Sequence, residues 1–239
     1  NRDFGLDYWS NRIDRWQDFP PVENTINASL ACAFSRYQRQ QVTEYLAWQA
    51  EIVREYAQPH QFVTHNFDFE WRGYSYGVQP RVDHFAAAQA LDIAGVDIYH
   101  PSQAHLTGRE IAFGGAITRS LKPGQNYFVL ETQAQGFAQW TPYPGQLRLQ
   151  AFSHIASGAA MVSYWHWHSI HNAFETYWKG LLSHDFSRNP TWQEATTIGA
   201  DFARLSPQLA ELKAENDVAL LISNEAMDAL NHFRPGDAE

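Results

Sequence analysis

The sequence predicts an α/β fold, a (β/α)8 barrel of which this chain carries roughly half. Apolar segments suited to buried strands alternate with segments of helical periodicity. The strands expected at residues 61, 96, 127 and 160 start roughly 30 residues apart, which is the length of one βαβ unit. Such alternation favours parallel strands with right-handed crossovers. Four units occupy residues 60–212, whereas a complete barrel needs about 250 residues.

The N-terminal part predicts one long helix followed by a strand. Ser35 is a candidate N-cap, and apolar residues repeat near the helical period as far as Tyr56, with Arg and Glu on the other face. Pro59 ends this helix because proline cannot continue it. The next segment, QFVTHNF, is apolar enough for a buried strand.

The middle of the chain repeats this order twice. An alanine-rich segment predicts a helix that is closed by Gly95, and VDIYHP then predicts a short strand. The segment 108–122 predicts a helix in spite of its two glycines, and NYFVLE predicts the strand after it.

The last segments complete the pattern. A helix is expected between a proline near its start and Gly158 near its stop, followed by the strand AMVSYWHW. Pro207 is a candidate interruption of the final long helix, and DVALLIS predicts one more strand. The predicted helices cover 35–56, 82–95, 108–122, 144–159 and 191–212. The predicted strands cover 61–67, 96–101, 126–131, 160–167 and 217–223.

An open doubly wound sheet would share this alternation of strands and helices. The chain contains neither G-x-G-x-x-G after a strand nor G-x-x-x-x-G-K-[ST], so a nucleotide-binding open sheet loses support. In addition, every expected strand ends in polar or aromatic side chains, as strands do at the catalytic rim of a barrel. These side chains are Thr64, His65 and Asn66; Asp97, Tyr99 and His100; Glu131; and Trp165–His168.

Composition narrows the class of function. The net charge of −9 argues against a nucleic-acid partner, which requires a basic surface, and no run of Lys or Arg suggests a membrane surface. With one cysteine, Cys32, the chain cannot form an internal disulfide. Cys32 is expected to be buried and without a catalytic role, and the low cysteine content agrees with a cytoplasmic location. Aromatic residues make up 15% and are interleaved with polar residues, which suits stacking against sugar rings, although aromatic residues also simply fill cores.

Glu131 is the first candidate catalytic residue. It follows an apolar strand and opens the segment TQAQGFAQW. A glutamate at such a strand end is a nucleophile, a general base or a structural ion-pair partner, and the absence of basic residues nearby weakens the last interpretation.

The segment YWHWHSIHNAFETYWKG contains the next candidates. His166, His168 and His171 resemble metal ligands, but the preferred interpretation is that they form hydrogen bonds to a polar substrate or orient neighbouring carboxylates. No metal or other cofactor is predicted. Glu175 is a catalytic acid, a substrate-hydroxyl acceptor or a surface residue. Trp178 offers a flat surface on which a sugar could stack.

A second glutamate, Glu225, forms an Asn-Glu pair with Asn224, which is the acid/base signature of many retaining barrel glycosidases. This pair lies beyond the last expected barrel helix. We therefore do not expect Glu225 to be catalytic.

The chain resembles glycoside hydrolase family 42 β-galactosidases over nearly its whole length. The most specific match is the series LE…W…PGQLRLQAF…GA…HWHS…FE..W.G.L.HD, and NRDFGLDYWSNRIDRW, FVTHNF and VDIYHP agree in the right order. The resemblance implies the second half of a TIM barrel over residues 1–213. It also implies that residues 214–239 begin a Rossmann-like oligomerisation domain.

The resemblance implies retaining hydrolysis of terminal β-D-galactosyl bonds, with Glu131 as the nucleophile. Trp140 matches a tryptophan of the galactose subsite, Glu175 a glutamate that accepts hydrogen bonds from sugar hydroxyls, and Tyr99 a tyrosine near the nucleophile. Trp178 lies where some members have a histidine, which would replace a hydrogen bond with stacking. The family's acid/base glutamate matches a position upstream of this chain, so the isolated chain is expected to be inactive.

Two alternatives stay open: a non-catalytic galactoside-binding remnant, and a related α-L-arabinopyranosidase, whose sugar lacks only the C6 arm of galactose. The expected partner is a β-galactoside, with no nucleic acid and no membrane. By resemblance, the chain is also expected to form a homo-oligomer, specifically a trimer.

Overall fold

The computed structural model describes residues 1–8, 10–23, 25–69, 82–99, 107–135, 141–176 and 178–232. They form two compact units. The first unit comprises residues 1–46, 80–83 and 218–239, and the second comprises residues 47–79 and 84–217.

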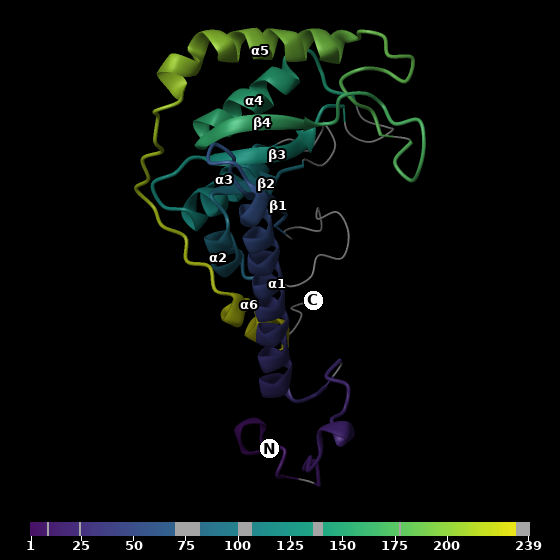
Figure 1. Cartoon of the computed structure of the whole chain (residues 1–239), viewed down its shortest axis with the longest axis vertical. Coiled ribbons are helices and arrows are strands. Elements are labelled where there is room, and N and C mark those ends of the chain that lie inside the picture. Colours follow the sequence, from purple (N-terminus) through teal and green to yellow (C-terminus); the bar gives the residue numbers. More distant parts are fainter. Residues whose placement is uncertain are drawn as a thin grey trace, which may run out of the picture. The chain divides into compact units, whose positions relative to one another are not determined.

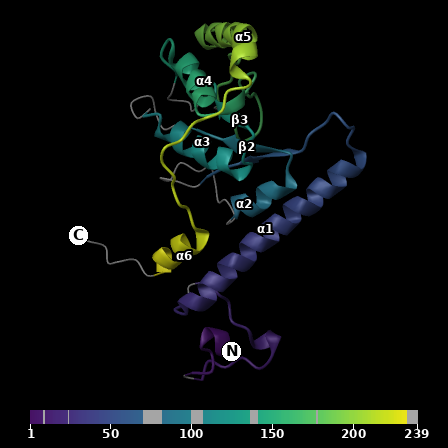
Figure 2. The same cartoon turned by 90° about the vertical axis from the view of Figure 1, so that its left-hand side faces the viewer.

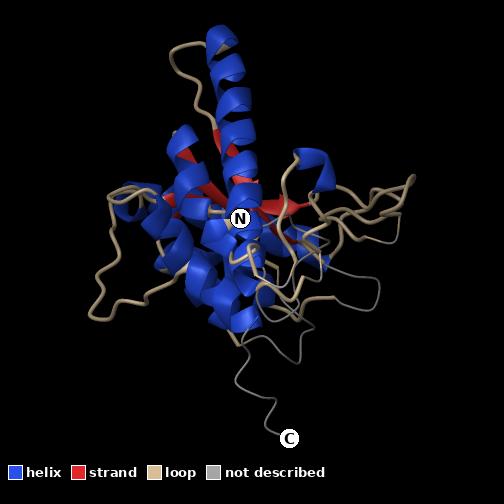
Figure 3. Cartoon of the chain, turned by 90° about the horizontal axis from the view of Figure 1, so that it is seen from below, coloured by secondary structure: helices blue, strands red, loops and turns tan. Residues whose placement is uncertain are grey.

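The second unit contains a four-stranded parallel sheet with the strand order β1-β2-β3-β4 (Figure 1). Each strand pairs with the next one along the chain, which confirms the predicted α/β fold with parallel strands. Figure 3 shows the strands (red) as one layer among the helices (blue). The strands are β1 (Thr64–Phe67), β2 (Ile93–Asp97), β3 (Tyr127–Gln133) and β4 (Ala159–Trp165). The helical elements of this unit are α2 (His84–Ala87), η3 (Ala88–Ala90), α3 (Arg109–Leu121), α4 (Gln146–Ala156) and α5 (Pro190–Leu209).

The core beside β4 is built from one face of α4. Leu147 and Ala151 are four residues apart, so they lie on the same side of the helix, and both are fully buried. They pack with Ile198 of α5 and the partly buried Tyr164 of β4. α5 begins with Asn189 as its N-cap, whose side chain accepts a hydrogen bond from the Trp192 amide. The helix continues through Pro207 to Leu209 without the interruption considered from the sequence.

Gly95 lies inside β2, which corrects the predicted helix over residues 82–95. The helical residues end at Ala90, and β2 begins at Ile93 because this segment pairs with β1. A Cβ atom on Gly95 would meet the Leu130 side chain and would lie 2.7 Å from the His65 carbonyl oxygen. The glycine therefore permits close approach within the sheet and does not end a helix.

The first unit contains η1 (Arg2–Phe4), η2 (Trp16–Asp18), α6 (Asn224–His232) and the start of α1 (Ala28–Tyr56), which continues into the second unit. α1 begins seven residues before the predicted Ser35, because the side chain of Asn27 accepts a hydrogen bond from the Leu30 amide at 3.0 Å. Ser35 is instead a buried residue inside the helix.

A buried ion pair joins α1 and α6, both labelled in Figure 2, within the first unit. The guanidinium of Arg39 contacts the Asp228 carboxylate at 2.5 Å and the Glu225 carboxylate at 3.1 Å. Arg39 and Asp228 are both nearly inaccessible to solvent, so the ion pair compensates two buried charges.

The strand predicted over residues 217–223 does not form. No strand includes these residues, although the structure describes all of them. Val218 is 86% exposed and Leu221 is 93% exposed. A strand is stabilised by hydrogen bonds to a neighbouring strand, and this segment has none among the described residues.

No helix in the described part of the chain combines the length and the apolar character needed to cross a membrane.

Candidate active site

Glu131 lies in β3, opposite Asp97 at the end of β2. Partners in a parallel pair point to the same face of the sheet, so the two carboxyl groups are neighbours. The hydroxyl of Tyr99 donates a hydrogen bond to Glu131 Oε2 at 2.8 Å. Asn66, from β1, donates through Nδ2 to Glu131 Oε1 at 3.2 Å. Donors at the ends of β1 and β2 thus reach the Glu131 carboxylate on β3.

Burial raises the pKa of Glu131 above its ordinary value, and the negative charge of Glu175 raises it further. The hydrogen bonds from Tyr99 and Asn66 lower the same pKa because they stabilise the ionised form. The hydrogen bond from Tyr99 therefore favours the ionised form of Glu131.

Asn66 and Asp97 also contact one another beside Glu131, and the sequence pattern assigned them no role beyond their place at expected strand ends. Asn66 Nδ2 also donates to Asp97 Oδ2, at 2.9 Å. Burial raises the pKa of Asp97 to about 7, and repulsion from Glu131 adds to this shift. The available signal was their position at expected strand ends, but that position alone does not show which side chains meet.

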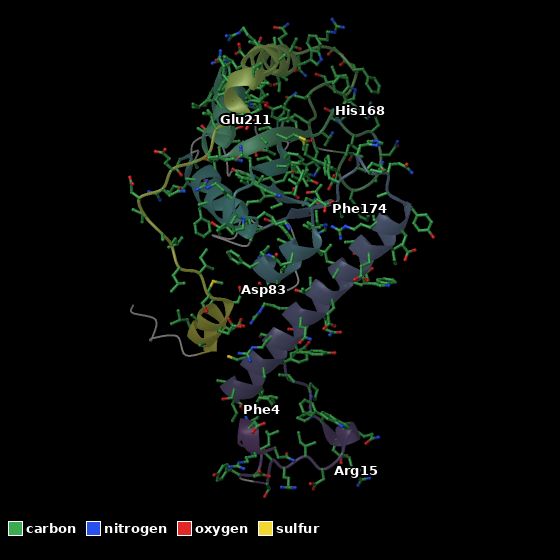
Figure 4. The ribbon with its side chains drawn as sticks, turned by 60° about the vertical axis from the view of Figure 1, so that its left-hand side comes forward. Phe4, Arg15, Asp83, His168, Phe174 and Glu211 are labelled. Atoms are coloured by element: carbon green, nitrogen blue, oxygen red, sulfur yellow. The ribbon has the colours of Figure 1, made fainter. Side chains whose placement is uncertain are left out.

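Glu175 and Trp178 lie in the segment after β4, to which Phe174 and His168 also belong (Figure 4). Glu175 is close enough for its charge to act on both Glu131 and His166. Trp178 is buried, and its backbone amide donates a hydrogen bond to the Glu175 carbonyl at 2.9 Å. The structure thus brings Glu175 near Glu131, as expected for a residue of the same site.

The three histidines of this segment direct ring nitrogens at backbone carbonyl groups. His166 Nδ1 pairs with the carbonyl of His168, His168 Nδ1 with that of Ser169, and His171 Nε2 with that of His184. In the described ranges, no group of three or more His, Cys, Asp or Glu side chains is placed to hold a metal ion. In each of these bonds the ring N–H donates to a carbonyl oxygen, and together the bonds hold the loop in shape.

Two other residues were considered from the sequence, Trp140 and Glu225. Trp140, the expected wall of the sugar subsite, falls within residues 136–140, outside the described part of the chain. Glu225 lies in the first unit, where it pairs with Arg39 and, at 3.7 Å, with Arg36. Its role there is an ion pair.

Known proteins of one family match this chain. Residues 1–205 match the model of glycoside hydrolase family 42, which is described as β-galactosidase. The β-galactosidase of Thermus thermophilus is 30% identical over 250 residues, covering 95% of this chain and 36% of the relative. The β-galactosidase BgaA of Clostridium cellulovorans is 26% identical over 237 residues, covering 94% of this chain and 34% of the relative. The chain thus spans about a third of the length of these curated relatives.

Solved structures agree on the fold. The β-galactosidase of the psychrophilic Marinomonas ef1 superposes with a TM-score of 0.83 at 22% identity, covering all of this chain and 40% of that structure. The polyextremophilic β-galactosidase of Halorubrum lacusprofundi superposes with a TM-score of 0.76 at 24% identity, covering 100% of this chain and 37% of that structure. The parallel sheet is therefore part of a (β/α)8 barrel, as predicted. With most of its length matched by the family model, the chain belongs to glycoside hydrolase family 42, the β-galactosidase family.

Proposed function

We propose that this chain contributes to a retaining glycoside hydrolase that cleaves terminal β-D-galactosyl residues, with Glu131 as the nucleophile. The observation that carries the proposal is the support of one carboxylate by Tyr99 and Asn66 at the strand ends of a barrel sheet. Membership of the family supplies the substrate class.

In this mechanism Glu131 attacks the anomeric carbon and forms a covalent glycosyl-enzyme, which water then hydrolyses. A second carboxyl group protonates the leaving oxygen and later activates the water. By family resemblance we assign that role to a glutamate outside this chain. Trp140 and Trp178 would contact the apolar face of the sugar, and Glu175 would accept hydrogen bonds from its hydroxyl groups.

Replacing Glu131 with Gln in the full-length protein tests this proposal. The amide keeps the shape of the side chain but cannot act as a nucleophile, so hydrolysis of an aryl β-galactoside should fall by about three orders of magnitude or more. Glu211→Gln is the matched control, because Glu211 is exposed and lies outside the site (Figure 4). Thermal unfolding of both variants should resemble that of the unaltered protein.

A 2-deoxy-2-fluoro-β-galactoside with a dinitrophenolate leaving group provides a direct readout. It should label the peptide that contains Glu131, as detected by mass spectrometry, and Glu131→Gln should remove the label. Near-normal turnover in Glu131→Gln would reject this residue as the nucleophile. Galactose binding without turnover of any aryl galactoside would favour the binding remnant, and preference for an α-L-arabinopyranoside would favour the related glycosidase.

Three further expectations complete the proposal: a Rossmann-like domain beginning at residue 214, assembly into a homo-oligomer (by family resemblance a trimer), and a cytoplasmic location. Sedimentation of the full-length protein tests the assembly, and a sedimenting monomer would reject it.

A further inference from the structure

The amide group of Asn66 lies between two carboxyl groups. Its nitrogen is 2.9 Å from Asp97 Oδ2 and 3.2 Å from Glu131 Oε1. A side-chain amide nitrogen carries two hydrogens, so it can donate to both acceptors at once. The reverse orientation would turn the amide oxygen toward carboxylate oxygens and lose both bonds. Asp97 therefore helps to fix the orientation in which Asn66 donates to Glu131.

The two carboxyl groups are unequally supported. Both oxygens of Glu131 accept a hydrogen bond, one from Tyr99 and one from Asn66. Asp97 accepts the Asn66 bond on Oδ2, whereas its Oδ1 is buried without a hydrogen-bond partner in the described part of the chain. Hydrogen bonds to the ionised form stabilise its charge, so Glu131 is the better place for a single negative charge.

We propose that Asp97 is a positioning residue: it retains the proton of the Asp97–Glu131 pair and anchors Asn66, which leaves the negative charge on Glu131. This inference deepens the proposed function and rests on it. It assigns a role to a residue that has no place in the two-carboxylate mechanism described above.

The electrostatic surroundings support this division of roles. Burial and the charge of Glu131 raise the pKa of Asp97 to about 7, and the charge of Asp68 acts in the same direction, opposed by the Asn66 bond. At Glu131, the charges of Glu175 and Asp68 raise the pKa, while the hydroxyl of Tyr99 and the amide of Asn66 lower it. Two hydrogen bonds thus oppose the rise in pKa at Glu131, whereas one opposes it at Asp97.

Asp97 is poorly placed to be the general acid. A retaining site needs room for the sugar between its two carboxyl groups. Here the gap is occupied by the amide of Asn66, which bonds to both. Asp97 acts on the reaction through Asn66 and through the charge balance of the pair.

Asp97→Asn and Asp97→Ala in the full-length protein separate the two parts of this role. Asparagine imitates protonated Asp97, because it is uncharged and keeps a carbonyl oxygen for Asn66. With a dinitrophenyl β-galactoside, which needs little acid assistance, kcat of Asp97→Asn near pH 6 should fall much less than kcat of Asp97→Ala. Asp97→Ala removes the acceptor, and its kcat should fall by about tenfold with little change in KM.

An infrared titration provides a readout that does not depend on activity. The unaltered protein should show a protonated-carboxyl C=O band with a midpoint near pH 7, and Asp97→Asn should lack that band. In Glu131→Gln the same band should titrate at lower pH, because the neighbouring charge is gone. Asp217→Asn, at an exposed position, is the control for the chemical change, and melting curves identify any variant that fails to fold.

Three results would overturn the inference: a loss of about tenfold or more in Asp97→Asn near pH 6, unchanged kcat in Asp97→Ala, or no band that depends on Asp97. Absence of galactoside turnover in the unaltered protein would instead reject the proposed function. The infrared titration would still decide where the proton of the pair resides.

Discussion

The hydroxyl of Tyr99 offers the most direct test of how this site controls the charge of Glu131. Tyr99→Phe removes the donor that lies 2.8 Å from Glu131 Oε2 and keeps the ring. The bond to Asn66 on the other carboxylate oxygen is retained. Any change in the titration of Glu131 should therefore reflect the loss of one hydrogen bond.

The size of the effect follows from the strength of that bond. A hydrogen bond to a charged group contributes about 1.5 to 3 kcal/mol, and the lower end applies because Glu131 is only half-buried and partly screened by solvent. One pKa unit corresponds to about 1.4 kcal/mol, so the pKa of Glu131 should rise by about one unit. The hydrogen bond favours the ionised form of Glu131, so its removal raises the pKa of Glu131. As the solution is acidified, Tyr99→Phe should therefore lose the activity that needs ionised Glu131 at a higher pH than the unaltered protein does.

The assay is the pH dependence of kcat/KM for a dinitrophenyl β-galactoside, measured on the full-length protein. The acid limb should move up by about one pH unit in Tyr99→Phe, with kcat/KM about tenfold lower on that limb. Tyr127→Phe is the matched control on the same strand as Glu131, since its buried hydroxyl has no hydrogen-bond partner among the described residues. An acid limb that stays in place in Tyr99→Phe would refute the reasoning, as would an equal shift in Tyr127→Phe.

Two predictions concern stability, measured by thermal unfolding of the full-length protein. Gly95→Ala should destabilise the protein by about 1 to 3 kcal/mol, because the added methyl group meets Leu130 and the adjacent strand. Gly199→Ala, in an open position of α5, is the control and should be neutral or slightly stabilising. Equal melting temperatures of the two variants would contradict this prediction. Arg39→Ala should cost about 3 to 5 kcal/mol, because it removes the guanidinium that forms an ion pair with the buried Asp228. A loss below about 1 kcal/mol would show that this pair contributes little.

The order of elements was predictable because it depends on local pattern. Apolar runs and helical periodicity located all four strands of the sheet and the long helix α5. The predictions failed where tertiary pairing competes with local preference. Alanine-rich residues suggested a helix as far as Gly95, but the chain gains more by pairing Ile93–Asp97 with both neighbouring strands.

The segment 217–223 shows the same principle in reverse. Its sequence suits a strand, yet it remains exposed and outside any sheet. A strand's hydrogen bonds belong to a pair of segments, so the sequence of one segment cannot ensure that it forms.

Local pattern was enough to predict the α/β fold class and the position of Glu131 at a strand end. The assignment of Tyr99 and Glu175 to the site came from the family resemblance; in the structure Tyr99 donates a hydrogen bond to Glu131, and the charge of Glu175 acts on it. Only the tertiary structure decided that Asn66 joins Glu131 to Asp97, because those contacts depend on the register of β1, β2 and β3 and on burial. Register and burial arise from residues far apart in the chain, so the charge balance at Glu131 could not be derived from local pattern.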